Sequence, residues 1–473
     1  TVTAGSGASA FKTGETPSGT VSIEPSSGAA IYVETGTNAS SAAVVKGSPF
    51  EFSTSIDASA AYFHSEAWAS SNIYIGGVGL SGAEDHIAFA TTDAAGKVTT
   101  EGASEDNWNI RWDGETLTLK GATIKGNRLI SRSGQYYDAA ALYCEKALKI
   151  VLEGDSTIES VTEEKAYIDG IFVKDDIEIS GIGKLTVTSA AVYDETMDLG
   201  SCGISGDGKL TVKNGATVIA TGGDNSGYGI SQGINVKDLT VEEGASVIAT
   251  GGKADGNAGM SIGIRVGHVT AVYGTVNAAG GNAVMSSFGV QTEDAVITGT
   301  LEATGSPTEG NKEGPETSPE SAGVSVSSGI FMTNNFTIDG GTVTATGGTA
   351  GGKAGLSAGI YIGGSDSIVM VNGGTVKSTG GADSAVSAGI YASVYDNNEG
   401  KEPNVNVTTN GGTVEITGVN YGAKIEGTFT VAGGEVTVAA TGSSGKAIET
   451  DSVKISPTAP QLISVMAGAS AET

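Results

Sequence analysis

The chain contains LTVKNGATVIATGG at Leu210–Gly223, and LTVEEGASVIATGG begins 29 residues later at Leu239. Later copies of the second half of this segment read IDGGTVTATGG, VNGGTVKSTGG and TNGGTVEITG. A second motif alternates with the first and reads QGINVKD, IGIRVGH or AGIYIGG. Repetition at a nearly fixed period is the sequence signature of units that stack on one another. The chain is therefore expected to be a repeat protein.

Each repeat holds three short extended pieces, of the LTV, GTVxATG and GIxV types. Apolar and polar residues alternate within each piece, which predicts strands with one buried face. In GTVTATGG, Val343 and Ala345 are expected to face the core, while Thr342, Thr344 and Thr346 face solvent. Stacking equivalent strands about 4.8 Å apart would build internal columns of Val, Ile, Leu and Ala. We therefore predict an all-β fold, a right-handed parallel β-helix (solenoid) of about ten three-stranded coils.

The repeat divides the chain into three parts. Residues 73–455 carry the predicted β-helix. Residues 1–72 are rich in Ser and Ala with short strand-like pieces, and we expect an N-terminal β-structured cap there. Residues 456–473 depart from the repeat and are expected to form a C-terminal cap or tail. The polar insertions at 305–322 and 395–404 carry Gly and Pro, which predicts surface loops.

Composition restricts the partners. With 25 Lys and Arg against 53 Asp and Glu, the formal net charge is −28. Because nucleic-acid binding depends on cationic side chains that neutralise phosphates, this charge argues against a nucleic-acid partner. No apolar run is long enough to insert into a membrane. The sequence starts at Thr1 instead of Met, so we expect that a signal peptide was removed and that the protein is extracellular, at the cell surface.

The two cysteines, Cys144 and Cys202, are too few for a disulfide framework. The repeat places them two coils apart, which corresponds to a rise of about 10 Å. A disulfide requires Cα atoms within about 7 Å of each other. Both thiols are therefore predicted to be free.

The segment Ala88–Ile124, AFATTDAAGKVTTEGASEDNWNIRWDGETLTLKGATI, and the GGTVTATGG and AGIYIGG units after it carry a resemblance. They resemble bacterial cell-surface right-handed parallel β-helix proteins with a polysaccharide-lyase-like carbohydrate-binding domain. The similarity covers residues 73–455. It implies a secreted or cell-surface location, glycan binding and bound calcium, and it implies no defined set of binding residues.

The residue after the inward Ile of the GIxV motif is expected to point outward and to form a column. Phe331, Tyr361 and Tyr391 would line up on three successive coils, with Tyr143 and Phe172 in the same column at the other end. Between these two groups the column holds Ser205, Asn235, Arg265 and Gln291. Flat aromatic rings can stack on the faces of sugars, so the five aromatic residues are the predicted carbohydrate-binding site. Alternatively, the rings pack across strands and stabilise the sheet.

Acidic residues recur five positions after the Gly of the same motif, at Asp175, Asp238 and Asp294, and the loop YDNNEG adds Asp396 and Asn398. Calcium takes about six to eight oxygen ligands from carboxylates, carbonyls and water. These five residues are the predicted Ca²⁺ ligands. The alternative is structural, because Asp and Asn at turns accept hydrogen bonds from nearby backbone N–H groups.

We therefore expect a non-catalytic, calcium-stabilised protein of the cell surface whose partner is a polysaccharide or another glycan. The first alternative is a structural adhesin or stalk that binds a host or bacterial surface protein through the loops at 305–322 and 395–404. The second is a polysaccharide lyase-like enzyme. A lyase on this fold needs a Lys or Arg base beside calcium, and no such cluster occurs in the repeat columns that can be aligned.

Overall fold

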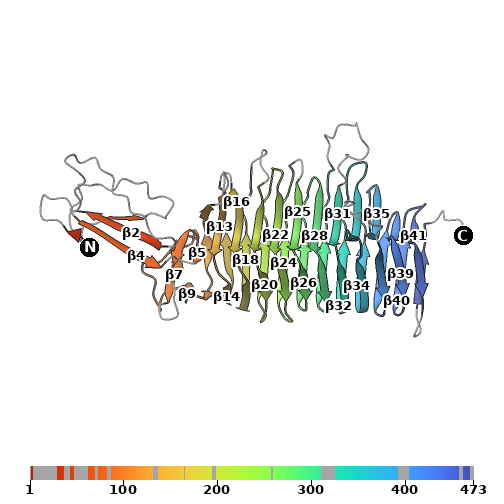
Figure 1. Cartoon of the computed structure of the whole chain (residues 1–473), viewed down its shortest axis with the longest axis horizontal. Coiled ribbons are helices and arrows are strands. Elements are labelled where there is room, and N and C mark those ends of the chain that lie inside the picture. The colour runs from red at the N-terminus through yellow and green to blue at the C-terminus, as the bar shows by residue number, and fades with distance from the viewer. Residues whose placement is uncertain are drawn as a thin grey trace. The chain divides into compact units, whose positions relative to one another are not determined.

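The computed structural model of the chain is shown in Figure 1. It describes residues 2–3, 29–36, 43–46, 62–69, 73–81, 87–131, 137–163, 166–193, 199–256, 259–310, 325–392, 404–456 and 462–468. Every regular element within these ranges is a β-strand, which confirms the all-β prediction. Over the same ranges, no helix has the length and apolar character needed to cross a bilayer.

The chain divides into two compact units. The first consists of Thr1–Ile73, Gly79–Ala88 and Trp112–Gly114, and the second of Tyr74–Val78, Phe89–Arg111 and Glu115–Thr473. The first unit contains an antiparallel sheet with the strand order β1-β4-β2-β3. Its strands are β1 (Val2–Thr3), β2 (Ala29–Gly36), β3 (Ala43–Lys46) and β4 (Tyr62–Ala69).

The second unit consists largely of three ladders of parallel strands, here named A, B and C, in which each strand pairs with its equivalent in the next repeat. Ladder A is built from the GIxV motifs and contains β13 (Tyr137–Cys144), β16 (Ala166–Val173), β19 (Ser201–Gly206), β22 (Ile230–Val236), β25 (Met260–Val266), β28 (Ser286–Thr292), β31 (Val326–Met332), β33 (Leu356–Ile362), β35 (Val386–Ala392), β38 (Tyr421–Lys424) and β41 (Lys446–Glu449).

Ladder B is built from the LTV motifs and contains β10 (Thr116–Leu119), β14 (Leu148–Glu153), β17 (Ile177–Ile182), β20 (Lys209–Val212), β23 (Asp238–Val241), β26 (Val269–Val272), β29 (Asp294–Ile297), β36 (Val405–Thr409), β39 (Gly427–Val431) and β42 (Ser452–Ile455). Ladder C is built from the GTVxATG motifs and contains β11 (Thr123–Lys125), β15 (Ser156–Glu159), β18 (Lys184–Thr188), β21 (Thr217–Thr221), β24 (Ser246–Thr250), β27 (Thr275–Ala279), β30 (Thr300–Thr304), β37 (Thr413–Gly418), β40 (Glu435–Ala440) and β43 (Leu462–Met466). The long strands β32 (Asn335–Thr346) and β34 (Ile368–Thr379) belong to both ladders.

The remaining strands lie before or beside the first repeats. They are β5 (Ile73–Ile75), β6 (Val78–Leu80), β7 (Ala88–Thr92), β8 (Val98–Thr99), β9 (Ile110–Trp112) and β12 (Arg128–Ser131). At the other end, β43 pairs in parallel with β40. Ladder C therefore continues into the residues that the sequence predicted to be a cap or tail.

The inside of the ladders is formed by the alternate positions that the sequence predicted. Val343 and Ala345 are fully buried, whereas Thr342 is exposed. Val343 pairs with Leu301 on one side and with Val376 on the other, so the core consists of continuous columns of aliphatic side chains. Such columns remove apolar surface from water only when neighbouring repeats stack, which makes stability a property of the array.

A column of buried serines fixes the corner between ladders C and A, and the sequence analysis did not predict it. It consists of Ser201, Ser231, Ser261, Ser287, Ser327, Ser357 and Ser387. The Ser231 hydroxyl donates to the Gly223 carbonyl and accepts from the Gly252 N–H, both at 2.7 Å. The next serine repeats this pattern one strand later. The serines thus pair backbone groups of the Gly-Gly corners that a buried turn would otherwise leave unsatisfied.

Candidate ligand pocket

A column of glycines brings ladder A against ladder C. It consists of Gly170, Gly203, Gly233, Gly263, Gly289, Gly329, Gly359, Gly389 and Gly422. A Cβ atom on Gly233 would lie 2.6 Å from the Thr250 nitrogen in ladder C and 2.6 Å from the Gly263 oxygen. Only glycine fits where two backbones approach this closely. Ladder A is therefore bent inward along this column.

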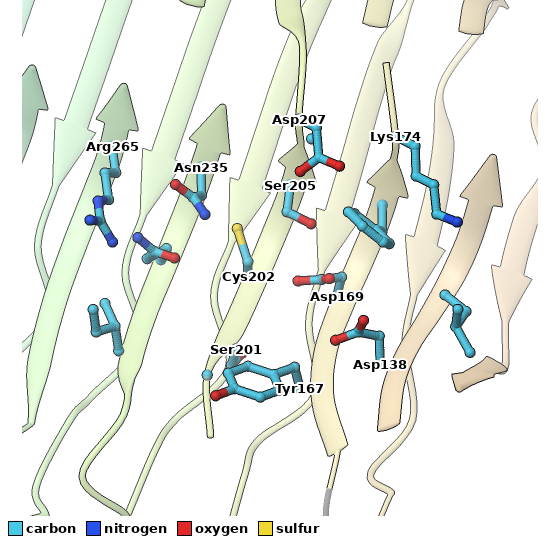
Figure 2. Close-up of a pocket in the computed structure, with 16 residues that line it drawn as sticks. Asp138, Tyr167, Asp169, Lys174, Ser201, Cys202, Ser205, Asp207, Asn235 and Arg265 are labelled. Atoms are coloured by element: carbon cyan, nitrogen blue, oxygen red, sulfur yellow. The ribbon is translucent and has the colours of Figure 1, made fainter. Parts of the chain in front are cut away.

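The bend places residues on both sides of each glycine on the outer face. Gln232 and Asn235 both line a pocket of about 630 Å³, although they are three residues apart on β22. Strict alternation would put two residues with this spacing on opposite faces of the strand. Among the residues described, the pocket extends over β16, β19, β22 and β25, with contributions from β12 and β13. Figure 2 shows its polar side chains on neighbouring strands.

The pocket holds a buried polar group with no partner. Gln232 is 7% exposed, and its Nε2 atom has no hydrogen-bond partner in the described part of the chain. An unpaired buried amide costs about 1–3 kcal/mol of stability. Such groups in a pocket are candidates for ligand contact, because a ligand oxygen can accept the missing hydrogen bond.

The other polar residues of the pocket come from adjacent strands. Asp138 lies on β13, Tyr167 and Asp169 on β16, and Ser205 on β19. Tyr167 pairs in register with Asp138, and Asp169 is two residues further along the same strand. The sequence analysis did not identify Asp138, Asp169 or Gln232. The sequence did contain a pattern that could have identified two of them, since Asp169 and Gln232 directly precede glycines of the column.

Cys202 lies at the floor of the pocket and is the second residue of β19. Cys144 pairs in register with Val173. Both thiols are buried and free, as the sequence predicted. Burial raises the pKa of Cys144, and burial together with the charge of Asp169 raises the pKa of Cys202 well above its usual value.

These pKa shifts predict low thiol reactivity, because only the thiolate is nucleophilic and a raised pKa lowers its fraction. In native protein at about pH 8, neither thiol should react with iodoacetamide within an hour, whereas both should react in denaturant. Mass spectrometry of the intact protein counts the labels. Rapid labelling of Cys202 in the native protein would contradict the buried pocket floor described above.

The predicted aromatic column is present in the register of ladder A. Tyr143 pairs with Phe172, Phe331 with Tyr361, and Tyr361 with Tyr391. The ring centroids of these pairs are 5.9, 5.2 and 6.0 Å apart. The polar positions between the two aromatic groups also pair as expected, in the order Ser205, Asn235, Arg265 and Gln291.

Two of the five rings are not accessible. Tyr361 is 4% exposed and Tyr143 is 3% exposed. The Tyr361 ring lies in an apolar cluster on the outer face of ladder A, with buried Ile262, Phe288 and Leu356. Tyr143 donates a hydrogen bond of 3.1 Å to Glu145, and its burial raises its pKa. A buried ring offers no face to a sugar, so these two residues serve as packing groups in this structure. Phe172, Phe331 and Tyr391 are half-buried.

The predicted calcium ligands are not brought together. Asp175 Oδ1 accepts a hydrogen bond from the N–H of Asp176, at 2.8 Å. Asp294 Oδ1 accepts from the backbone and side-chain nitrogens of Asn335, at 2.9 and 3.0 Å. Asp238 lies on ladder B, 4.0 Å from a ring nitrogen of His268. Leu239 pairs with Thr270, so Asp238 is aligned with Val269 on the next strand. Val269 in turn pairs with Asp294, so it lies between the two carboxylates in the ladder.

Asp396 and Asn398 lie outside the described residues, as do residues 311–322 and 395–403 of the predicted contact loops. Within the described ranges, no group of three or more His, Cys, Asp or Glu side chains could hold a metal ion. The hydrogen bonds of Asp175 and Asp294 correspond to the structural alternative. Calcium binding stays a prediction.

Comparisons with known proteins assign neither a family nor a function to the chain. No family model matches the chain, no curated protein matches it, and no solved structure matches it. The resemblance to β-helix surface proteins thus rests on the motifs of the sequence alone.

Proposed function

We propose that the second unit is a right-handed parallel β-helix that binds a glycan at the cell surface, without catalysis, in the pocket on ladder A. The three ladders support the β-helix, because strands of types A, B and C recur in the same order in each repeat. An experimental electron-density map tests the handedness directly. A left-handed path, or strands that do not stack repeat on repeat, would refute this part of the proposal.

The observation that carries glycan binding is the unpaired Gln232 amide in a pocket with both donors and acceptors. Sugar hydroxyl groups donate and accept hydrogen bonds. The Asp169 carboxylate can accept them, the Gln232 Nε2 group can donate, and the side chains of Ser205 and Asn235 can do both. A polyhydroxylated ligand would use this mixture, whereas an apolar ligand would leave it unsatisfied.

Tyr167 provides a flat surface beside these polar groups. Its ring lies next to Gly200, where an added Cβ would be 3.4 Å from the ring Cδ1 atom. Tyr167 is half-buried, in contrast to Tyr361. A half-buried aromatic ring beside hydrogen-bonding groups suits the apolar face of a sugar ring. Tyr167 and Phe172, the member of the predicted aromatic column that lines this pocket, are therefore the rings proposed to contact the sugar.

The first test is a glycan array with the purified chain, run with calcium and again with EDTA, followed by the Gln232→Met variant. Methionine has a similar volume and no donor, so the affinity for the glycan that binds should fall about tenfold. The urea midpoint should stay unchanged or rise, because the variant removes a buried unpaired amide. Calorimetry and urea unfolding measure the two effects.

Gln291→Met is the matched control. Gln291 belongs to the same face of ladder A and also has an unpaired buried atom, Oε1, but it does not line the pocket. Its replacement should leave glycan affinity within about twofold of the unmodified chain. An equal loss in both variants would assign the effect to the sheet as a whole. Failure of the unmodified chain to bind any glycan, with or without calcium, would refute the proposed function.

A further inference from the structure

We infer that Asn214 is the preferred site of spontaneous deamidation among the Asn-Gly pairs of this chain, so that its side-chain amide is lost and an aspartate or isoaspartate remains. The inference does not depend on the glycan pocket. Asn214 lies in the corner between β20 of ladder B and β21 of ladder C, and no residue of this corner lines the pocket. The supporting facts are the residue that follows Asn214, the openness of its corner and the restraints on the other Asn-Gly pairs.

The reaction needs only water. The backbone nitrogen of the residue after the asparagine attacks the side-chain carbonyl carbon, and the new C–N bond closes a succinimide ring. The bond from that carbon to the side-chain nitrogen breaks, and the nitrogen leaves as ammonia. Water then opens the ring at one of its two carbonyl groups and gives aspartate or isoaspartate. Glycine favours the attack when it is the following residue, because it has no side chain to obstruct the ring and a permissive backbone.

Three Asn-Gly pairs occur in the sequence, and they begin at Asn214, Asn372 and Asn410. All three lie where the chain passes from ladder B to ladder C. Asn372 belongs to β34, which is part of both ladders, and Asn410 directly follows β36. Because the pairs are chemically identical, their surroundings decide which of them reacts.

The side-chain amides of Asn372 and Asn410 are held by hydrogen bonds. Asn372 Nδ2 donates to Asp339 Oδ1 at 2.6 Å, and Asn410 Nδ2 donates to Asn372 Oδ1 at 2.8 Å. Ring closure turns the side chain toward the next backbone nitrogen, so it has to break these bonds. The bond to the Asp339 carboxylate is charge-assisted and therefore among the stronger hydrogen bonds of a protein. Both asparagines should therefore react slowly.

Asn214 has no such restraint. It is exposed, and its side chain makes no hydrogen bond with any residue that the structure describes. The attacking atom would be the Gly215 nitrogen, and the described part of the chain contains no hydrogen bond from it. A Cβ atom added to Gly215 would have no neighbour within 4 Å, so the corner has room to rearrange.

The neighbouring repeat shows that this corner tolerates an acidic side chain. There Glu243 and Gly244 occupy the positions of Asn214 and Gly215, and both glycines have a φ of +79°. Asn214 has a φ of +56°, which asparagine and aspartate adopt more readily than most other residues. An aspartate product therefore fits the corner, and the modified chain should remain folded.

The test is incubation of the purified, folded chain in mildly alkaline buffer, followed by peptide mapping with mass spectrometry against an unincubated sample. The Asn214 peptide should convert at least about tenfold faster than the Asn372 and Asn410 peptides, which is the factor expected from one hydrogen bond that must first break. In denaturant the three peptides should convert at similar rates, because the hydrogen bonds are then absent.

Asp339→Ala tests the restraint directly. Asp339 is exposed, so the variant should fold, and it removes the acceptor of Asn372 Nδ2. Conversion at Asn372 should become several-fold faster, while the rate at Asn214 should stay unchanged. Similar rates at all three sites in the folded chain, or an unchanged rate at Asn372 in Asp339→Ala, would overturn the inference. So would an Asn214 peptide that converts in denaturant and not in the folded chain.

Discussion

Replacing Gly263 with alanine should destabilise the second unit by about 3 kcal/mol. A Cβ atom at this position would lie 2.6 Å from the Ala279 nitrogen and 2.7 Å from the Gly289 oxygen. Both are backbone atoms held in ladders, so neither can move without shifting a neighbouring strand. The expected result in urea unfolding is a lower midpoint. Calorimetry should also show weaker glycan binding, because the pocket depends on the bend in ladder A.

Gly267→Ala is the control for this experiment. Gly267 follows β25 directly, and the nearest atoms to an added Cβ are the Lys237 oxygen and Cα at 3.7 and 3.8 Å. That separation is ordinary van der Waals contact, so the stability should stay within about 0.5 kcal/mol. If Gly263→Ala were as stable as Gly267→Ala, the glycine column would not hold the two ladders together.

The three ladders could be predicted from the sequence because stacking repeats the same local rule many times. A strand with one buried face must alternate, and a shift of one residue would turn Val343 and Ala345 to solvent. Each copy of the motif confirms the register of the others. The separation of the two free cysteines followed from the same reasoning, since Cys144 lies on β13, Cys202 lies on β19, and β16 lies between these strands in ladder A.

The bend of ladder A was not predicted, because its cause lies between ladders and not within a strand. A glycine inside a strand indicates a bulge or a close backbone approach, but the sequence does not say which backbone approaches. The pattern S-x-G-I around Ser231 and Gly233 contained both devices, the serine that caps the corner and the glycine that allows the bend. The pocket and its residues Asp169 and Gln232 follow from that bend.

The aromatic column shows the opposite case, in which the register was predicted and the environment was not. Phe331, Tyr361 and Tyr391 pair as expected. Their exposure depends on which residues occupy the other outward positions of the same strands. Leu356, which precedes Tyr361 on β33, is apolar, so the rings pack into a cluster. In β16 the corresponding outward positions are Tyr167 and Asp169, and that part of the face stays polar and open.

Replacing Tyr361 with alanine should destabilise the chain by about 3–4 kcal/mol, because a nearly fully buried ring is removed from a packed cluster. Tyr228→Ala provides the comparison, since Tyr228 is 45% exposed and its removal should change stability by about 0.5 kcal/mol or less. Urea unfolding measures both variants. Calorimetry below the unfolding transition should show that folded Tyr361→Ala keeps its glycan affinity, because Tyr361 lies on β33, outside the strands that line the pocket. A stable Tyr361→Ala variant that no longer binds glycan would instead assign the binding site to the aromatic cluster around Tyr361 and remove the argument for the pocket.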